Sequence, residues 1–366
     1  MNFFIYKLFF LFALFFTIPK IYNAQSVSTS ERNVTKIAEG VYAIQHPDAP
    51  NGFPQGNTTV VIGKEKVLVV DACYFPSSAK EDLEQIQKWT DKPVAYLVNT
   101  HWHLDHNNGN YVYKDAFPEI KIISHPATKE LIATKNKEGV ISFLNKYETM
   151  KKQTETGKDS DGKLIDQKEL ESTKQYVESR IEVYNQFKQI KLTPPNTDIT
   201  NEMKIDLGDR KVEIKFLGKG NTEGDIVVYL PEEKIIAAGD LVVSPVPYGF
   251  GSHPSEWEKT LRKIYDMDVD IIIPGHGRVL KDKTYLQKII EVINLVVEST
   301  KQEIIKYGHT SGIPLTQTTI ENIQNAIDWT EFRKYFSQGI KENEGFFDNS
   351  IRGGLVRAAV HEAEGK

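Results

Sequence analysis

Three short apolar segments that run directly into histidine or carboxylate residues constrain this chain more than any other feature. Each segment is rich in β-branched residues and has the length of a buried strand. The polar residues after them are expected at strand ends, where they can reach into a common cleft. The three junctions are Val94–Val98 before His101-Trp102-His103-Leu104-Asp105-His106, Ile235–Ala238 before Gly239-Asp240, and Ile271–Ile273 before Pro274-Gly275-His276-Gly277.

The first junction places three histidines and an aspartate within six residues. Alternate residues of an extended chain point the same way, so His101 and His103 can face one metal ion together. The turn that follows offers Asp105 and His106 to a second position. Imidazole and carboxylate groups are suitable zinc ligands, so the segment predicts a zinc centre. A chance cluster of surface histidines is the alternative.

Each of the other two junctions adds one candidate ligand, Asp240 and His276. A carboxylate after small residues at a strand end, as at Asp240, can reach into a cleft and bridge two cations. The glycines on either side of His276 let the backbone turn tightly and leave the imidazole exposed. Gly239-Asp240 alone is a weak signal, because Gly-Asp is a common turn, and the glycine-flanked His276 is a stronger one. Together with the histidine cluster they specify a metal site.

The remaining pattern predicts an α/β fold of two packed sheets with helices outside. Strands are expected at 58–62, 67–70, 121–124, 212–217 and 226–230, and helices at 78–89 and 255–265, capped by Ser78 and Ser255. Residues 127–191 are rich in charged and polar residues and predict a helical insertion, either a cap over the site or a solvated hairpin. From Thr284 onward the chain is expected to be helical.

At this point the chain resembles the metallo-β-lactamase superfamily over roughly residues 35–295, excluding the insertion. The resemblance rests on the His101–His106 motif, Asp71 after an apolar strand, Gly239-Asp240 and Gly275-His276-Gly277. It implies a four-layer αββα sandwich with the metals at one edge of the two sheets. It further implies His101 and His103 as ligands of a first metal, Asp105, His106 and His276 as ligands of a second, and Asp240 as a bridge.

One position departs from the family pattern. Where the family usually has a Gly-His-Thr motif with a third histidine for the first metal, this chain has Gly220-Asn221-Thr222. An amide oxygen is a much poorer zinc ligand than imidazole. Asn221 therefore predicts a weakened first site, with one tight zinc and a second, weaker one. His253 or a water molecule could complete that site, although His253 is also an ordinary loop residue.

The ligand set predicts hydrolysis by zinc-bound hydroxide, because zinc lowers the pKa of bound water to about 7. Asp105 is expected to orient the water and relay a proton to the leaving group. Tyr248, in the Pro- and Gly-rich loop 244–253, could touch substrate or donate to an oxyanion, or pack the loop together with Phe250. Trp102 is expected to pack, and His46, His125, His309 and His361 to be structural or surface residues.

The N-terminus predicts export. Lys7, an apolar run from Leu8 to Ile18 and Ala24 before a polar segment describe a secretory signal peptide cleaved near residue 24. An uncleaved anchor is the alternative, but the apolar run is shorter than the roughly 20 residues of a spanning helix. The protein is thus expected in the periplasm or outside the cell, with no stable membrane span.

Net charge and cysteine content give two further expectations, one about binding partners and one about disulfides. The net charge of −5 falls to −7 when residues 1–24 are removed with their two lysines, which argues against nucleic acid as partner. The single cysteine, Cys73, cannot form an internal disulfide. It is expected to be a buried structural thiol, with a metal-binding or reactive role as the alternative. The sequence makes no prediction of oligomeric state.

These observations predict three regions: a signal peptide at 1–24, a metallo-β-lactamase-fold domain at 25–295 and a helical extension at 296–366, which could pack on the domain or form a dimer contact. The predicted function is an exported zinc-dependent hydrolase that attacks an ester, lactone or amide carbonyl of a small molecule, with β-lactams, thioesters and sulfate esters also among its candidate substrates. The alternative is a catalytically weak, metal-containing protein that binds a ligand.

Overall fold

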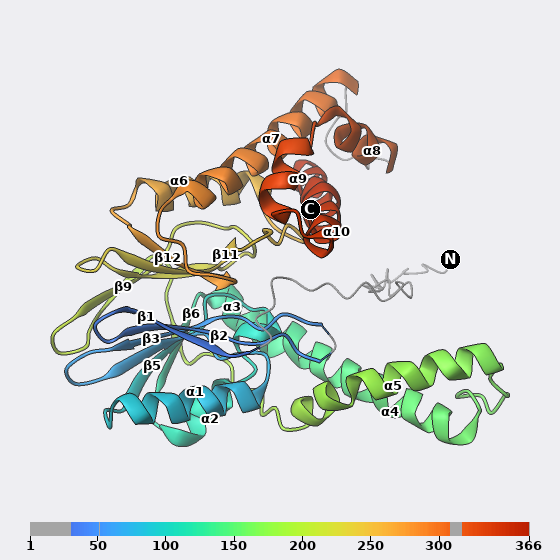
Figure 1. Cartoon of the computed structure of the whole chain (residues 1–366), viewed down its shortest axis with the longest axis horizontal. Coiled ribbons are helices and arrows are strands. Elements are labelled where there is room, and N and C mark those ends of the chain that lie inside the picture. Colours follow the sequence, from blue (N-terminus) through green and yellow to red (C-terminus); the bar gives the residue numbers. More distant parts are fainter. Residues whose placement is uncertain (1–30, 51, 308–316, 366) are drawn as a thin grey trace, which may run out of the picture.

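Two β-sheets packed face to face form the centre of the molecule (Figure 1). The computed structural model describes residues 31–50, 52–307 and 317–365. The predicted signal peptide and His309 lie outside these ranges. Helices cover the outer face of each sheet, so the order of layers is αββα, as predicted.

The first sheet has seven strands in sequence order from β1 to β7. The strands from β1 to β4 pair antiparallel, and those from β4 to β7 pair parallel. Parallel pairing brings the carboxyl ends of β4 and β5 to the same edge, with Val70 opposite Val98. The strands are β1 (Asn33–Ala38), β2 (Val41–Gln45), β3 (Thr58–Ile62), β4 (Val67–Val70), β5 (Val94–Val98), β6 (Lys121–Ser124) and β7 (Thr197–Asp198).

The second sheet has five strands in the order β12-β11-β10-β9-β8. Strands β8 to β11 pair antiparallel, and β11 and β12 pair parallel, with Gly239 opposite Pro274. The loops after β11 and β12 therefore also leave the sheet at one edge. The strands are β8 (Glu202–Asp206), β9 (Lys211–Phe216), β10 (Ile226–Leu230), β11 (Ile235–Val243) and β12 (Ile271–His276).

Three apolar clusters fill the spaces between the layers. In β4, Leu68 and Val70 point between the two sheets, whereas Val67 and Val69 point toward the helices outside. Both faces of this sheet are thus covered, which is why β4 is apolar at every position. The outer helices of the first sheet are α1 (Pro76–Trp89) and α2 (Asn110–Ala116), and those of the second are α6 (Pro254–Asp266) and α7 (Thr284–Tyr307).

The region 127–191 is helical, as the sequence predicts. It contains α3 (Pro126–Leu131), the π-helical turn η2 (Ile132–Asn136), α4 (Lys137–Thr156) and α5 (Gln167–Phe187). Helices α4 and α5 form a hairpin that projects away from both sheets (Figure 1). At its base, Val183 and Phe187 join Tyr74 and Phe75 in a small apolar cluster that connects the hairpin to the rest of the molecule. Leu104, in the histidine-rich segment 101–106 (the ligand segment), packs against this cluster. The base of the hairpin thus borders the ligand segment, while its far end extends away from the sheets.

The C-terminal helices pack on the rest of the chain. They are α8 (Gln317–Ala326), α9 (Thr330–Ser337), α10 (Lys341–Phe347), the π-helical segment η3 (Asp348–Leu355) and α11 (Val356–Ala363). Phe336, Phe347 and Val356 belong to the same apolar cluster as Ile289 of α7 and Ile236 of β11. The predicted boundary at residue 295 falls inside the continuous helix α7, and the domain division remains a prediction.

Most predicted strands have the observed bounds, but both predicted helix caps are wrong. Helix α1 begins at Pro76, and Ser78 lies in its first turn, where its hydroxyl donates to the side-chain oxygen of Gln55. Helix α6 begins at Pro254 after His253, so Ser255 also lies inside the helix. In both helices a proline near the first position sets the start, because its fixed φ suits the first turn.

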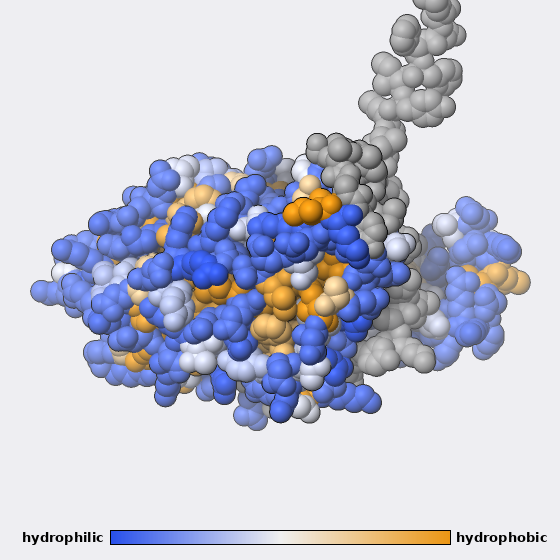
Figure 2. Space-filling view, turned by 90° about the horizontal axis from the view of Figure 1, so that it is seen from above, coloured by the Kyte–Doolittle hydropathy of each residue, from blue (hydrophilic) through white to orange (hydrophobic). Residues whose placement is uncertain are grey.

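The surface seen in Figure 2 is mainly hydrophilic, with apolar residues in separate patches. Among the helices of the described ranges, none has the length and apolar character needed to cross a bilayer.

Candidate metal centre

Asp71 organises the segment that carries the histidines. It lies directly after β4, and the backbone N–H and hydroxyl of Thr100 both donate to its carboxylate at 2.8 Å. The same carboxylate lies 2.8 Å from Nδ1 of His106. A carboxylate on one ring nitrogen fixes the orientation of an imidazole and leaves the other nitrogen for a metal. The sequence marked Asp71 as part of the family pattern, but only the structure gives its role.

Asp105, His106 and His276 converge on one point. Oδ2 of Asp105 lies 3.4 Å from Nε2 of His106 and 3.0 Å from Nε2 of His276, and the two imidazole nitrogens are 3.2 Å apart. His106 comes from the 3-10 turn η1 (Leu104–His106) and His276 from the end of β12. These three groups therefore form one candidate metal position, from the residues that the sequence assigned to the second metal.

Asp240 lies between this position and the other histidines. Its Oδ1 is 3.3 Å from Nε2 of His106, and its Oδ2 is 3.6 Å from Nε2 of His101. The two carboxylate oxygens thus face different imidazoles, which is the arrangement expected of a bridging ligand. A Cβ at position 275 would lie 2.1 Å from Oδ1 of Asp240, so only glycine fits there.

His101 and His103 form the second candidate position. Nε2 of His101 lies 2.9 Å from Nδ1 of His103, and Nδ1 of His101 lies 3.0 Å from the hydroxyl of Thr100. His101, His106 and Asp240 also group closely enough to share an ion. The structure therefore brings together all six residues predicted as the main ligands.

Asn221 and His253 have contacts in and around the loop 244–253: the side chain of Asn221 contacts the Tyr248 backbone, and the backbone N–H of His253 donates to the Gly220 oxygen. The amide nitrogen of Asn221 donates to the backbone oxygen of Tyr248 at 2.7 Å, and its Oδ1 is buried without a hydrogen-bond partner among the described residues. Within the same ranges, His253 belongs to no group of His, Cys, Asp or Glu side chains that could hold a metal. Apart from the candidate bridge Asp240, the described His, Cys, Asp and Glu side chains thus add no further ligand to the His101–His103 position.

The charges of the site suit a cation. Although burial disfavours it, the nearby imidazoles of His106 and His276 hold the pKa of Asp105 well below its ordinary value. Burial, the charge of His106 and that of His103 lower the pKa of His101 despite the neighbouring carboxylates. The site thus combines ionised carboxylates with an unprotonated His101. Despite burial, the charges of Asp105 and Asp240 raise the pKa of His106 and His276, so these two imidazoles release a proton when a cation binds. This nitrogen and oxygen donor set, held within hydrogen-bonding distances, fits zinc.

Tyr248 lies beside the site. Its ring centroid is 5.7 Å from that of His103, and it also contacts Phe250. Burial, with the added charge of Asp105 and Asp240, raises the pKa of Tyr248 to about 12. Its hydroxyl therefore keeps its proton at neutral pH and is able to donate a hydrogen bond.

The remaining aromatic and histidine residues have structural surroundings. The ring of Trp102 lies under the ammonium group of Lys135 of η2. His125 stacks on Phe216 and accepts the first N–H of α3, and His361 is exposed on α11. His46 is buried against Cys73, which is a buried thiol as predicted.

Sequence reasoning missed the polar groups that hold the ligand segment in place. The amide nitrogen of Asn107 donates to the backbone oxygens of Trp102 and His103, and Asn136 of η2 donates to Trp102 as well. The only sequence signal is an asparagine just after the histidine motif, which is common in turns. Asn136 carries no signal, because it reaches the site from 30 residues further along the chain.

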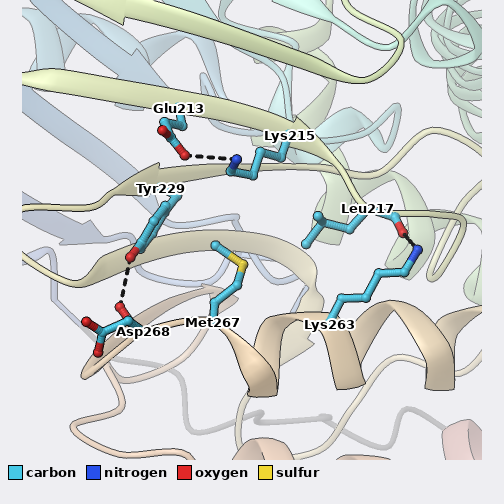
Figure 3. A pocket seen from close by; sticks show the side chains of 7 residues that line it. All are labelled: Glu213, Lys215, Leu217, Tyr229, Lys263, Met267 and Asp268. Atoms are coloured by element: carbon cyan, nitrogen blue, oxygen red, sulfur yellow. Dashed lines mark hydrogen bonds and ion pairs between the residues drawn. The ribbon is translucent and has the colours of Figure 1, made fainter.

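A separate cavity of about 390 Å³ lies between the second sheet and α6 (Figure 3). Its charged groups are already paired: Lys215 with Glu213 at 2.8 Å, and Lys263 with the backbone oxygen of Leu217. None of the predicted ligands lines it. The cavity therefore adds nothing to the metal centre.

Comparison with known proteins agrees with this geometry. Residues 51–276 match the model of the metallo-beta-lactamase superfamily. A metallo-beta-lactamase type 2 from Bacillus cereus is 33% identical over 279 residues, which cover 72% of this chain and 87% of that protein. A linear primary-alkylsulfatase from a Pseudomonas species is 18% identical over 68% of this chain and 47% of its own length.

Solved structures show the same fold. The DIM-1 metallo-beta-lactamase has a TM-score of 0.50 at 20% identity and covers 72% of this chain and 97% of its own. A metallo-beta-lactamase from Pontibacter korlensis has a TM-score of 0.51 at 18% identity, over 72% of this chain and 99% of its own. These matches show that the chain, with its six converging candidate ligands, belongs to the metallo-beta-lactamase superfamily and is a metal-dependent hydrolase.

Proposed function

We propose that this protein is an exported, zinc-dependent hydrolase that cleaves an ester, lactone or amide bond in a small molecule. The observation that supports this most directly is the convergence of Asp105, His106 and His276, with Asp240 reaching from that group to His101. The side chains of Asp105, His106 and Asp240 are buried, whereas the side chain of His276 is 13% exposed. A substrate could therefore approach past His276.

Two zinc ions are proposed with unequal affinity. His106, His276 and Asp105 would hold the tight ion, and His101 and His103 would hold the weaker one, with Asp240 between them. Asn221 is the reason for the difference, because its amide is engaged with the Tyr248 backbone instead of supplying an imidazole. When bound, zinc lowers the pKa of a water molecule to about 7, so that hydroxide is present as the nucleophile near neutral pH.

The side chains around this water would share the remaining work. The Asp105 carboxylate, ionised at neutral pH, would orient the attacking water and pass its proton to the leaving group. The protonated hydroxyl of Tyr248 would donate to the oxygen of the carbonyl as negative charge develops there. Asp71 would keep His106 in place through the hydrogen bond to its Nδ1.

The relatives order the candidate substrates. A β-lactam stands first, since the Bacillus cereus relative is named as a beta-lactamase and matches over most of its length. A sulfate ester stands second, because the alkylsulfatase match spans less than half of that enzyme. Lactones and thioesters complete the panel.

The test is a turnover assay with purified, zinc-loaded protein that lacks residues 1–24. Nitrocefin, a lactone, a thioester and an alkyl sulfate are each offered, with and without a chelator. Turnover should appear with one substrate class, vanish with chelator and vanish in His106→Ala. The matched control is His361→Ala, which removes an exposed imidazole of α11 and should leave activity unchanged. Bound zinc without turnover on any substrate would instead favour the ligand-binding alternative, for which Asn221 is the supporting feature.

Export rests on the N-terminal sequence, and it has its own test. The full chain produced in a bacterial host should appear in the periplasm or medium with a new N-terminus near residue 25. Intact protein in the cytoplasm or in the membrane fraction would contradict this part of the proposal.

A further inference from the structure

A second cluster of metal-ligand side chains lies outside the metal centre. Cys73 follows β4, His46 follows β2 and Asp82 lies on α1, and all three side chains are completely buried. Thr58, the first residue of β3, is buried beside them. Residues from four separate elements thus point at one place between the first sheet and α1.

The spacing of the ligand atoms matches a tetrahedral metal. Nε2 of His46 lies 3.1 Å from Oδ2 of Asp82 and 3.4 Å from Sγ of Cys73, and Sγ lies 3.5 Å from the same carboxylate oxygen. With zinc bonds of about 2.3 Å to sulfur and about 2.0–2.2 Å to nitrogen and oxygen, the edges of a tetrahedron are about 3.3–3.6 Å.

The hydrogen-bonding capacity of His46 points the same way. Its Nε2 has three polar neighbours, because Thr58 Oγ1 lies 3.2 Å away in addition to Asp82 and Cys73. One ring nitrogen offers either a single proton or a single lone pair, and so serves one good hydrogen bond. A cation between these atoms would satisfy all of them at once, with Thr58 Oγ1 nearby as a neutral oxygen.

We propose that Cys73, His46 and Asp82 form a buried structural site for a zinc-class transition metal, separate from the metal centre described above. On binding, the Cys73 thiol loses its proton to solvent and the thiolate, the neutral His46 imidazole and the Asp82 carboxylate become ligands. The two negative ligands balance a divalent ion. Arg32, which donates to the other carboxylate oxygen of Asp82 at 2.8 Å, keeps 20% side-chain exposure, so its charge remains partly solvated.

Such an ion would join the segments that follow β2 and β4 to α1, in a chain whose single cysteine forms no internal disulfide. Because the ligands are fully buried, the ion would enter as the protein folds and would contribute to stability.

The single cysteine makes the test specific. A cobalt ion bound by a thiolate gives a near-ultraviolet charge-transfer absorption, and the metal centre has no cysteine to produce one. Burial and the nearby Asp82 charge raise the pKa of the Cys73 thiol well above its ordinary value, so it does not become a thiolate by itself. The band therefore reports Cys73 bound to metal.

The experiment uses the whole chain from residue 25, refolded with cobalt, and the double variant His106→Ala/His276→Ala, which removes ligands of the other centre. We expect the band in both proteins, with at least one cobalt per chain retained by the double variant. Cys73→Ser should abolish the band, and His46→Gln should abolish or shift it while the thiol remains.

A folded double variant without the band would overturn the proposal and leave a hydrogen-bonded network at these residues. This holds even if Cys73→Ser fails to fold, since the double variant keeps the cluster intact. The result is independent of the turnover assay, because the double variant is expected to be inactive in either case.

Discussion

Asn221 stands, within a preserved fold, where the family pattern has the histidine of its Gly-His-Thr motif. The motif around it keeps the glycine, the threonine and the aspartate of the family pattern. Its amide nitrogen is fixed to the Tyr248 backbone, which directs the side chain to the loop 244–253. The position is therefore an anchor for that loop as well as the place where a third imidazole is missing.

Replacing Asn221 with histidine should restore the missing ligand. We expect Asn221→His to raise the zinc content by about one ion per chain at a fixed free zinc concentration, because imidazole binds zinc far better than an amide oxygen. Metal analysis after equilibrium dialysis measures the change. Asn221→Ala is the control, since it loses the contact with Tyr248 and gains no ligand. Equal zinc content in wild type and Asn221→His would contradict the interpretation.

Asp225 gives a prediction for pH. Burial raises its pKa to about 8, although the N–H of Thr222 donates to it. The unfolded value is about 3.9, so between about pH 4 and pH 8 the folded state holds a proton that the unfolded state has lost. Stability from this residue therefore falls as pH rises through that window, by at most about 1.4 kcal/mol per pH unit.

The amide in Asp225→Asn does not titrate. In chelator-treated protein, its free energy of unfolding relative to wild type should increase steadily from pH 4 to pH 8. Urea unfolding at several pH values provides the measurement. Parallel pH profiles for the two proteins would show that Asp225 is ionised in the folded state.

At the scale of elements, the insertion takes part in the metal centre through its first turns. Asn136 of η2 is buried, and its amide nitrogen lies 2.5 Å from the Trp102 backbone oxygen and 3.0 Å from Oδ1 of Asn107. Asn107 in turn donates to the His103 backbone oxygen at 2.6 Å. The insertion is thus connected to the ligand segment by two asparagines.

Asn136→Ala should loosen that segment. We expect about a 10-fold loss of zinc affinity, in the range found when groups behind metal ligands are removed. The unfolding free energy should fall by about 1–3 kcal/mol, because buried polar groups lose their partner. Thr149→Ala on the exposed part of α4 is the matched control. Zinc titration and urea unfolding of both variants measure these changes. Unchanged zinc affinity in Asn136→Ala would contradict a role of Asn136 in supporting the ligand segment.

Elements differ in how well the sequence predicts them. The buried strands β3, β4, β5, β6 and β10 have the predicted bounds, because their apolar runs are ended by turn or polar residues. The helix starts were wrong because Ser78 and Ser255 resemble caps, while proline fixes the start earlier. The six candidate ligands lie in local motifs, whereas the contacts of Asp71 and Asn136 join distant segments of the chain.

At the scale of the whole molecule, the C-terminal extension supports the loop of Tyr248. The hydroxyl of Ser350 accepts a hydrogen bond from the Gly249 N–H at 2.8 Å and donates one to the Pro247 backbone oxygen at 2.7 Å. Ser350 is fully buried in η3. The last helices therefore hold a segment that the sequence associated with substrate.

Ser350→Ala should leave the buried N–H of Gly249 without its partner. We expect a loss of about 1–3 kcal/mol of stability and a raised KM for the substrate identified by the panel. Ser179→Ala on the exposed surface of α5 should change neither quantity. A wild-type KM in a folded Ser350→Ala protein would show that the loop keeps its shape without the extension.

The length and packing of helix α7 determine which parts of the protein unfold together. It runs without a break from Thr284 to Tyr307, and its Leu286, Ile289 and Ile293 lie in the same apolar cluster as β11 and α11. Slow amide exchange should therefore be lost from the second sheet and the C-terminal helices in one step, as expected of a single foldon. A truncation after residue 295 would cut that unit and expose its interior, so the catalytic half should not persist as a separate fragment.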